Sequence, residues 1–298
     1  MNESLLMELE EHAIQCARQA GQLLAELFTK PLEVTFKSAG TTNPVTEADK
    51  KADEFLKEFI RKRYPTHGIL TEESGNVGGT TSNFLWVLDP LDGTTNYLNR
   101  FPFYASSIGI LHNGIPIAGS MYLGSSLNSE GTIFHARQGG GAWADDKRIN
   151  VSANTTIESS RLIGIPSRWR ERVARGLRQR TGEPRSMGSI AGELAYTASG
   201  IFQYSLFGAP QVWDAAAGVL LVKEAGGEVL TMPGNSRHWE TLYSFADGGH
   251  SSTHESVARW RAPLMAANSS ILAILATGMG RPTPFKQIVG SLFRRGPV

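Results

Sequence analysis

The sequence contains a single cysteine, Cys16, among its 298 residues. One thiol excludes an internal disulfide, a cysteine-rich zinc module and an iron–sulfur cluster. A dominant charge is also missing, because 29 basic side chains are balanced by 28 acidic ones and the net charge is +1. A dedicated nucleic-acid-binding protein usually carries a strong basic field. These absences favour a reduced, cytoplasmic protein.

Long apolar runs are absent as well. The most apolar late segment, residues 264–277, is interrupted by an Asn-Ser-Ser sequence, and it is shorter than the roughly 20 residues that span a bilayer. The first residues include Glu3 and Glu8, where a signal peptide would need basic and then apolar residues. We therefore expect no membrane partner, and we expect residues 264–277 to form a buried strand followed by a helix.

Apolar periodicity predicts how helices and strands follow one another. Residues 5–28 carry leucines at helical spacing, and Thr46 with Asp49 resembles a capping box that begins a second helix. Short strands come next, at residues 68–71, 85–88, 106–111, 116–122 and 132–136. The later part mixes strands with helices, namely strands 162–165 and 228–231 and helices 191–198 and 215–225. This interspersion predicts a layered mixed α/β fold, with a boundary between residues 150 and 186.

Three short acidic segments carry the candidate chemistry: 71–75 (TEESG), 86–96 (WVLDPLDGTTN) and 212–214 (VWD). In the second segment, a tight turn can aim the carboxylates of Asp89 and Asp92 at one point, and the Leu91 carbonyl lies between them. Mg²⁺ prefers such oxygen ligands. The following Gly-Thr-Thr sequence predicts a helix start, where free backbone amides favour a phosphate.

Simpler interpretations of the same residues stay open. An Asp-Pro-x-Asp-Gly string is also typical of a plain turn. Asp214, directly before a helix, is typical of an N-cap. Glu72 and Glu73 are equally compatible with a solvated strand end. Each signal alone is weak, and the hypothesis of a metal and phosphate site depends on their joint appearance.

Two motifs together resemble the signature regions of the inositol monophosphatase family. Members of this family are Mg²⁺-dependent, lithium-sensitive phosphatases. The motifs are residues 86–96 and 212–227 (VWDAAAGVLLVKEAGG), and the resemblance runs from about residue 8 to 278. It implies an αβαβα sandwich of the inositol monophosphatase / fructose-1,6-bisphosphatase type. The implied parts are an N-terminal α+β half (1–150), a C-terminal α/β half (151–278) and a basic amphipathic tail (279–298). The resemblance also implies a homodimer.

The resemblance further implies roles for individual residues. A first Mg²⁺ would be bound by Glu72, Asp89 and the Leu91 carbonyl, and a second by Asp89, Asp92 and Asp214. A third, mostly hydrated Mg²⁺ would lie near Glu72. The amides of Gly93, Thr94 and Thr95 would hold the phosphate, and Asp49 with the Thr94 hydroxyl would orient the attacking water. Near the substrate we expect Lys37 and the loop of Gly188, Ser189 and Ile190.

Two positions depart from the family pattern. Phe207 and Gln203 stand where relatives have acidic residues, the first of which hydrogen-bonds inositol hydroxyls in animal members. A phenyl ring accepts no hydrogen bond from a hydroxyl. We therefore expect a Mg²⁺-dependent phosphomonoesterase for inositol monophosphate or a related sugar phosphate, with relaxed or altered preference. The alternatives within the family are a fructose-1,6-bisphosphatase and a 3′-phosphoadenosine-type nucleotidase.

Two basic segments lie outside the motifs. Residues 161–185 contain eight arginines, which could bind RNA phosphates in a regulatory family member that contacts RNA or a polymerase. The simpler interpretation is a helix that buries Trp169, Val173 and Leu177 and exposes its arginines. The tail from residue 281 has amphipathic helical spacing, typical of a helix that binds a partner or a membrane surface, or that packs on its own protein or dimer mate.

Overall fold

The computed structural model of this chain describes residues 1–30, 34–36, 44–78, 82–124, 131–177, 180–234, 236, 238–246 and 254–279. Lys37 and almost all of the predicted tail lie outside these residues. The helices are α1 (Glu3–Phe28), α2 (Glu47–Arg63), α3 (Thr94–Leu98), the 3₁₀ helix η1 (Ser167–Trp169), α4 (Arg170–Gly176), α5 (Ile190–Ala198), α6 (Val212–Glu224), α7 (His254–Ala258) and α8 (Ser269–Gly278).

Within the described residues, the first half of the chain forms an eight-stranded sheet with the order β10-β9-β8-β7-β6-β5-β3-β4. Its strands are β3 (Gly68–Thr71), β4 (Gly75–Val77), β5 (Phe84–Asp92), β6 (Ala105–His112), β7 (Ile115–Leu123), β8 (Thr132–Arg137), β9 (Gly141–Ala144) and β10 (Lys147–Ile149). Its neighbouring strands are antiparallel except for β3 and β5, which run parallel. This one parallel pair lies at the candidate site.

A second sheet, six-stranded in the described part of the chain, has the order β12-β11-β13-β16-β14-β15. Its strands are β11 (Leu162–Gly164), β12 (Glu183–Arg185), β13 (Phe202–Phe207), β14 (Glu228–Thr231), β15 (Glu240–Thr241) and β16 (Leu264–Ala267). A short pair, β1 (Val34–Phe36) and β2 (Pro44–Thr46), lies apart from both sheets. The two large sheets therefore divide between residues 149 and 162, although the assignment of two separate domains stays a prediction.

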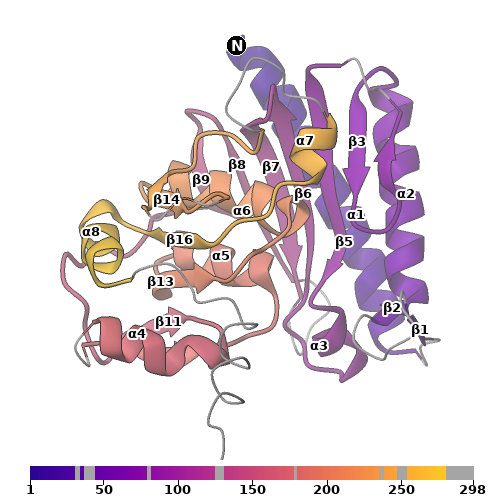
Figure 1. Cartoon of the computed structure of the whole chain (residues 1–298). Helices are drawn as coiled ribbons and strands as arrows, with labels where there is room; N and C mark the ends of the chain where they lie inside the picture. The colour runs from indigo at the N-terminus through magenta and orange to yellow at the C-terminus, as the bar shows by residue number, and fades with distance from the viewer. Residues whose placement is uncertain are drawn as a thin grey trace, which may run out of the picture.

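The strands bury both of their faces, so the helices form layers on either side of each sheet (Figure 1). Trp86 and Leu88 of β5 pack with α1 and α2, whereas Leu85 and Val87 pack with α5 and α6. This alternation follows from the two-residue period of a strand. The outer face of the second sheet is covered by α8 and α4. The layers confirm the expected αβαβα sandwich.

Most predicted elements are confirmed, and the differences are local. The Thr46 capping box begins α2, and residues 264–277 form β16 and α8 as expected. The predicted arginine-rich helix is short, because α4 covers only Arg170–Gly176, but Trp169 and Val173 are buried as expected. The N-cap interpretation of Asp214 is wrong: Gln211 caps α6, and Asp214 is its third residue.

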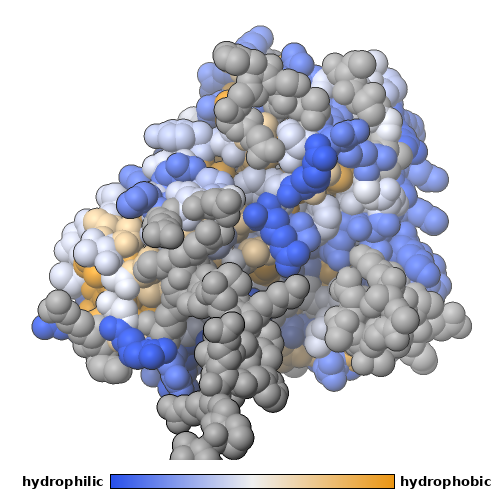
Figure 2. Space-filling model, in the orientation of Figure 1, coloured by the Kyte–Doolittle hydropathy of each residue, from blue (hydrophilic) through white to orange (hydrophobic). Residues whose placement is uncertain are grey.

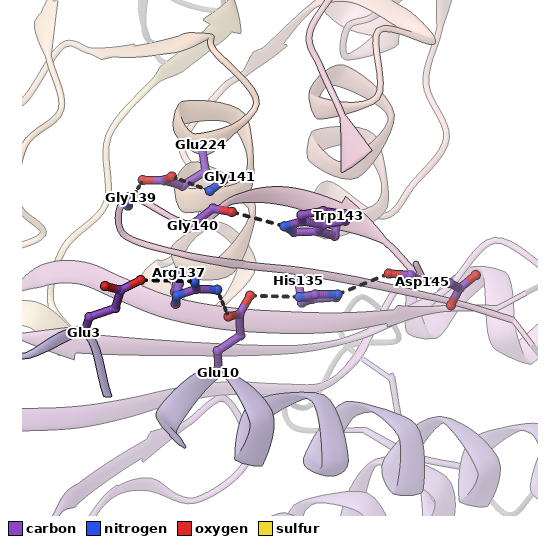
Figure 3. Close-up of polar contacts among 10 residues, drawn as sticks. All are labelled: Glu3, Glu10, His135, Arg137, Gly139, Gly140, Gly141, Trp143, Asp145 and Glu224. Carbon is purple, nitrogen blue, oxygen red and sulfur yellow. Dashed lines mark hydrogen bonds and ion pairs between the residues drawn. The ribbon is translucent and has the colours of Figure 1, made fainter. Parts of the chain in front are cut away.

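Polar contacts fasten α1 and α6 to the first sheet (Figure 3). Glu10 of α1 forms an ion pair with Arg137 of β8 at 2.8 Å, and its other carboxylate oxygen lies 2.8 Å from Nδ1 of His135. Glu224, at the end of α6, accepts hydrogen bonds from the amides of Gly139 and Gly141, at 2.9 and 3.0 Å. The last turn of α6 is thereby tied to the β8–β9 turn, which holds this helix of the second half against the first sheet.

The surface in the same orientation is hydrophilic over α2, and apolar side chains gather around α8 (Figure 2). Ile274 of α8, for example, is 39% exposed. Among the described helices, none combines the length and the apolar character needed to cross a bilayer.

Candidate active site

The parallel pairing of β3 and β5 brings Glu72 next to Asp89. Thr71, the last residue of β3, lies in register with Leu88, and the Glu72 amide donates a hydrogen bond to the Leu88 carbonyl at 3.1 Å. Glu72 and Asp89 each directly follow one residue of the Thr71–Leu88 pair, so they lie next to each other at the same end of two adjacent strands. A solvated strand end was the simpler interpretation of Glu72. In the structure, Glu72 lies beside Asp89, whose side chain is buried and 1% exposed.

Helix α6 brings Asp214 to the same place from the second half of the chain. The helix packs on β6 so closely that a Cβ built on Gly109 would lie 2.6 Å from the Ala216 side chain. Glycine at this position is therefore what allows α6 to approach the sheet. Asp214 itself is fixed by a hydrogen bond that its Oδ2 accepts from the Gln211 amide at 2.8 Å.

The three carboxylates form one compact group. Glu72, Asp89 and Asp214 each offer an oxygen, and these oxygens all lie within 4.8 Å of one another. Burial raises the pKa of Asp89 well above its usual range, and the charges of Glu72 and Asp92 raise it further. Burial likewise raises the pKa of Asp214 to about 8, with the charge of Asp92 as the next cause. The group therefore concentrates negative charge that a cation would neutralise.

Asp92 lies beside this group and joins it to the second half of the chain. Its Oδ2 accepts hydrogen bonds from the Ser189 hydroxyl at 2.6 Å and from the Ala191 amide at 2.7 Å. Burial raises its pKa to about 6, although the bond from Ser189 acts in the opposite direction. Asp92 is not among the carboxylates whose oxygens all lie within 4.8 Å of each other. Its charge nevertheless adds to that of the cluster.

Asp49, in the first turn of α2, lies next to Thr94, the first residue of α3. The Thr94 hydroxyl lies 3.2 Å from Asp49 Oδ1 and 3.2 Å from the Leu91 carbonyl oxygen. Asp49 Oδ2 accepts hydrogen bonds from the amide and the hydroxyl of Thr46. Asp49 is buried, and burial raises its pKa. The capping box thus holds the Asp49 carboxylate with one oxygen directed at Thr94.

The Gly93–Thr95 segment begins α3, as the sequence predicts. Gly93 has φ 89°, a left-handed conformation that favours glycine, and it is the N-cap residue of α3. The first amides of a helix have no partner within that helix. Asn96 donates hydrogen bonds at 2.7 Å to the Phe103 carbonyl and to the Met187 carbonyl. The start of α3 is thereby locked against the loop that precedes α5.

A pocket of about 230 Å³ adjoins this loop. The predicted substrate residues Gly188, Ser189 and Ile190 line it, and so does Phe207 at the end of β13. Gln203 lies elsewhere: its side chain donates to the Thr156 carbonyl at 2.8 Å and accepts from the Glu158 amide at 3.2 Å. Gln203 is not among the residues that line the pocket, and its side chain instead braces the segment that precedes β11.

Other residues around the site had no signal that we recognised in the sequence. Glu193 lies in the apolar helix α5, where it accepts hydrogen bonds from the amides of Met187 and Gly188 at 2.7 and 3.3 Å. Ser74 donates to Asp53 of α2 at 2.6 Å and accepts from Lys57 at 2.7 Å. These contacts brace the loops that carry Ser189 and Glu72, and they depend on tertiary packing.

The donor set fits a hard divalent cation. The ligand atoms that converge are carboxylate oxygens, without a histidine or cysteine in the group, and Mg²⁺ prefers oxygen donors. A buried carboxylate needs a positive partner or a metal to stay ionised, and the charges that raise the pKa of Asp89, after burial, are those of other carboxylates. The described residues thus favour a cation bound by Glu72, Asp89 and Asp214.

The fold and the site together define a class: layered α/β proteins in which a buried acidic centre lies where two sheets and their shared helices meet. Comparison with known proteins identifies the family. The family model of the inositol monophosphatase family matches residues 5–266. The chain therefore belongs to the inositol monophosphatase family, a family of phosphatases.

Several relatives cover most of the chain. It is 35% identical over 240 residues to Nus factor SuhB of Escherichia coli (strain K12), covering 77% of this chain and 87% of that protein. It is 34% identical over 225 residues to fructose-1,6-bisphosphatase/inositol-1-monophosphatase of Aquifex aeolicus (strain VF5), covering 73% and 83%. Phosphatase IMPL1, chloroplastic, of Arabidopsis thaliana is 34% identical over 249 residues, covering 77% of this chain and 63% of the plant protein.

A solved structure shares the architecture. The extragenic suppressor protein suhB of Bartonella henselae matches with a TM-score of 0.72 and 30% sequence identity. The match covers 91% of this chain and 98% of that chain. The similarity therefore extends over both sheets and is not confined to the motifs.

Proposed function

We propose that this chain is a Mg²⁺-dependent phosphomonoesterase that hydrolyses inositol monophosphate or a related sugar phosphate. The observation that carries the proposal is the convergence of Glu72, Asp89 and Asp214 within 4.8 Å, beside the start of α3. Phosphate monoester hydrolysis without a catalyst is extremely slow. A cation centre beside a phosphate site can accelerate this reaction, because the cations neutralise the negative charge of the phosphate, which otherwise repels the nucleophile.

In this proposal, the carboxylates of Glu72, Asp89, Asp92 and Asp214 and the Leu91 carbonyl bind two to three Mg²⁺ ions. When bound, Mg²⁺ supplies Lewis acidity that withdraws charge from the phosphate and makes water a better nucleophile. The amides of Gly93, Thr94 and Thr95 hold the phosphate oxygens, since amides at a helix start donate to anions.

Asp49 and Thr94 orient the attacking water. When the Thr94 hydroxyl donates to Asp49 Oδ1, 3.2 Å away, its oxygen is free to accept a hydrogen bond from water. The water oxygen then forms the new bond to phosphorus, the ester P–O bond breaks, and the leaving alcohol oxygen takes up a proton. Cys16 has no place in this chemistry, because it is buried in α1 and burial raises its thiol pKa.

The substrate preference follows from Phe207. This side chain lies in the pocket at the position where animal relatives pair a carboxylate with inositol hydroxyls. Phe207 cannot make that pair, which favours a broader or different sugar phosphate specificity. The name of the Aquifex aeolicus relative includes both fructose-1,6-bisphosphatase and inositol-1-monophosphatase, in keeping with such breadth.

A regulatory role is the second candidate. The relative from Escherichia coli is named a Nus factor, and Arg170, Arg175, Arg180 and Arg185 are exposed along residues 170–185. Such a surface could contact RNA phosphates. A homodimer, lithium sensitivity and a cytoplasmic location likewise stay predictions from the sequence.

The two candidates are separated by measuring phosphate release from inositol 1-phosphate and fructose 1,6-bisphosphate. The phosphatase proposal predicts release that requires Mg²⁺, that stops with EDTA and that Li⁺ inhibits. Replacing the four exposed arginines by glutamine should leave this release within twofold of the unmodified protein. No release from either substrate at saturating Mg²⁺ would contradict the phosphatase proposal, and RNA binding lost with the arginines would then support the regulatory one.

A further inference from the structure

The pocket beside the candidate site contains a cation that the proposed reaction does not use. Arg168, in η1, lines this pocket together with Phe207 and the 188–190 loop. In the part of the chain that the structure describes, no carboxylate pairs with Arg168. Arg137 and Arg63, in contrast, form ion pairs with Glu10 and Glu8.

The Arg168 guanidinium lies close to Gly208, the residue that follows β13. A Cβ built on Gly208 would lie 2.9 Å from Nη2 of Arg168 and 3.4 Å from the Trp169 ring. The guanidinium therefore lies beside the end of β13, where Phe207 and Gly208 also line the pocket. A guanidinium carries its full charge at neutral pH and presents a planar fork of donors that matches phosphate or carboxylate.

The nearby acidic group does not form an ion pair with Arg168. Glu193 lines the same pocket, but its Oε1 accepts hydrogen bonds from the amides of Met187 and Gly188. Burial also raises the pKa of Glu193 to about 7, so its negative charge is reduced near neutral pH. The pocket therefore combines a guanidinium that has no carboxylate partner among the described residues, an apolar ring, and a carboxyl group that accepts hydrogen bonds from its own loop.

The pocket adjoins the start of α3 directly. A Cβ on Gly93 would lie 3.3 Å from the Gly188 carbonyl oxygen and 3.3 Å from the Ser189 Cβ. The 188–190 loop, which lines the pocket, therefore lies within contact distance of the residue that begins α3. At about 230 Å³, the pocket is smaller than the roughly 300–1,000 Å³ of sites for drug-sized ligands, which suits one small ring or chain.

We propose that Arg168 binds a second oxyanion, a phosphate or a carboxylate, on the leaving alcohol of the substrate. The inference rests on the proposed phosphatase function and names the substrate class of the same site: small phosphomonoesters that carry a further anionic group. Phe207 contributes an apolar surface against the carbon skeleton. Inositol 1-phosphate, whose ring carries no second anion, gains nothing from Arg168.

The test compares kcat/KM for three substrates: fructose 1,6-bisphosphate, 3-phosphoglycerate and inositol 1-phosphate. Arg168→Gln should lower kcat/KM about tenfold for the two doubly anionic substrates, mainly through KM, because a partly exposed charge-assisted contact is lost. Inositol 1-phosphate should change by less than about twofold. If only one doubly anionic substrate responds, the oxyanion is the one that this substrate carries. Arg170→Gln, exposed on α4 outside the pocket, is the matched control and should leave all three unchanged.

Two results would overturn the assignment: an equal loss for all three substrates, which would place Arg168 on the ester phosphate, or no loss for the doubly anionic pair. A binding measurement separates this failure from failure of the phosphatase function. Fructose 1,6-bisphosphate is titrated calorimetrically into the Asp49→Asn protein with Mg²⁺, with and without Arg168→Gln. About tenfold weaker binding with Arg168→Gln supports the assignment even if no turnover is found, and unchanged binding rejects it.

Discussion

Replacing Asp89 by Asn tests the metal centre most sharply, because it removes one charge and keeps the shape of the side chain. Glu72, Asp89 and Asp214 offer oxygens within 4.8 Å of one another, and a cation bound among them would lie no farther than this from Asp89. Its attraction to one carboxylate charge would be about 4 kcal/mol at an effective dielectric constant near 20. A loss of about 4 kcal/mol from transition-state stabilisation corresponds to a rate reduction of about a thousandfold. We therefore expect Asp89→Asn to lower Mg²⁺-dependent phosphate release by about a thousandfold or more.

Thermal unfolding of the same variant separates lost metal binding from a damaged fold. In EDTA, Asp89→Asn should unfold at the same temperature as the unmodified protein or higher, because like-charge repulsion is relieved. Mg²⁺ at about 100 times its Kd should raise the free energy of unfolding of the unmodified protein by about 2.7 kcal/mol. The Asp89→Asn protein should lack this gain. Asp146→Asn is the control, since Asp146 is exposed in the turn between β9 and β10. Phosphate release within tenfold of the unmodified protein would remove Asp89 from the mechanism.

Two further predictions concern the water-orienting pair and the unneutralised charge. Thr94→Val should lower kcat about 100-fold, because it removes the hydroxyl between Asp49 and the water, and it should leave the Mg²⁺ affinity within twofold. Thr94→Ser keeps the hydroxyl and should retain most of the activity. Equal losses of kcat in the two variants would contradict this role of Thr94. The pKa values of Asp92 and Asp214, raised to about 6 and about 8, mean that these groups bind more protons when folded than when unfolded. The resulting stability is present below the unfolded pKa of about 4 and is lost as pH rises through 6 to 8. The difference in unfolding temperature between Mg²⁺ and EDTA should therefore grow from pH 5.5 to 8, and a constant difference would refute the charge argument.

The elements with strong local patterns could be predicted from the sequence. The leucine spacing of residues 5–28 and the Thr46 capping box are confirmed by α1 and α2. Strand alternation located β5 through β8 to within a few residues. Local sequence was sufficient here because each pattern has the period of the structure that it forms.

The acidic residues of the site were identified from motifs, but their convergence depends on tertiary structure. Glu72 reaches Asp89 through the parallel register of β3 and β5, and Asp214 arrives because Gly109 lets α6 lie close to the sheet. No local pattern contains either fact. The roles of the individual ligands, and those of Gly93 and Thr95, stay predictions.

The surroundings of the substrate were the least predictable part. Phe207 and Gln203 both stand where relatives have acidic residues, but Phe207 lines the pocket, whereas Gln203 donates a hydrogen bond to the Thr156 carbonyl. Arg168 belonged, in the sequence, to an arginine-rich stretch without any sign of a pocket. Its contact with Gly208 appears only when η1 packs on the end of β13.

The central claim is that Glu72, Asp89 and Asp214 bind a divalent cation. Crystals grown with Mn²⁺ and phosphate test it directly, since the anomalous signal of Mn²⁺ locates the ion. The account predicts an anomalous peak about 2.1 Å from oxygens of all three carboxylates, as in Mg²⁺-type coordination, with phosphate beside Gly93–Thr95. Crystals that bind Mn²⁺ at other positions but show no peak between these three residues would contradict it.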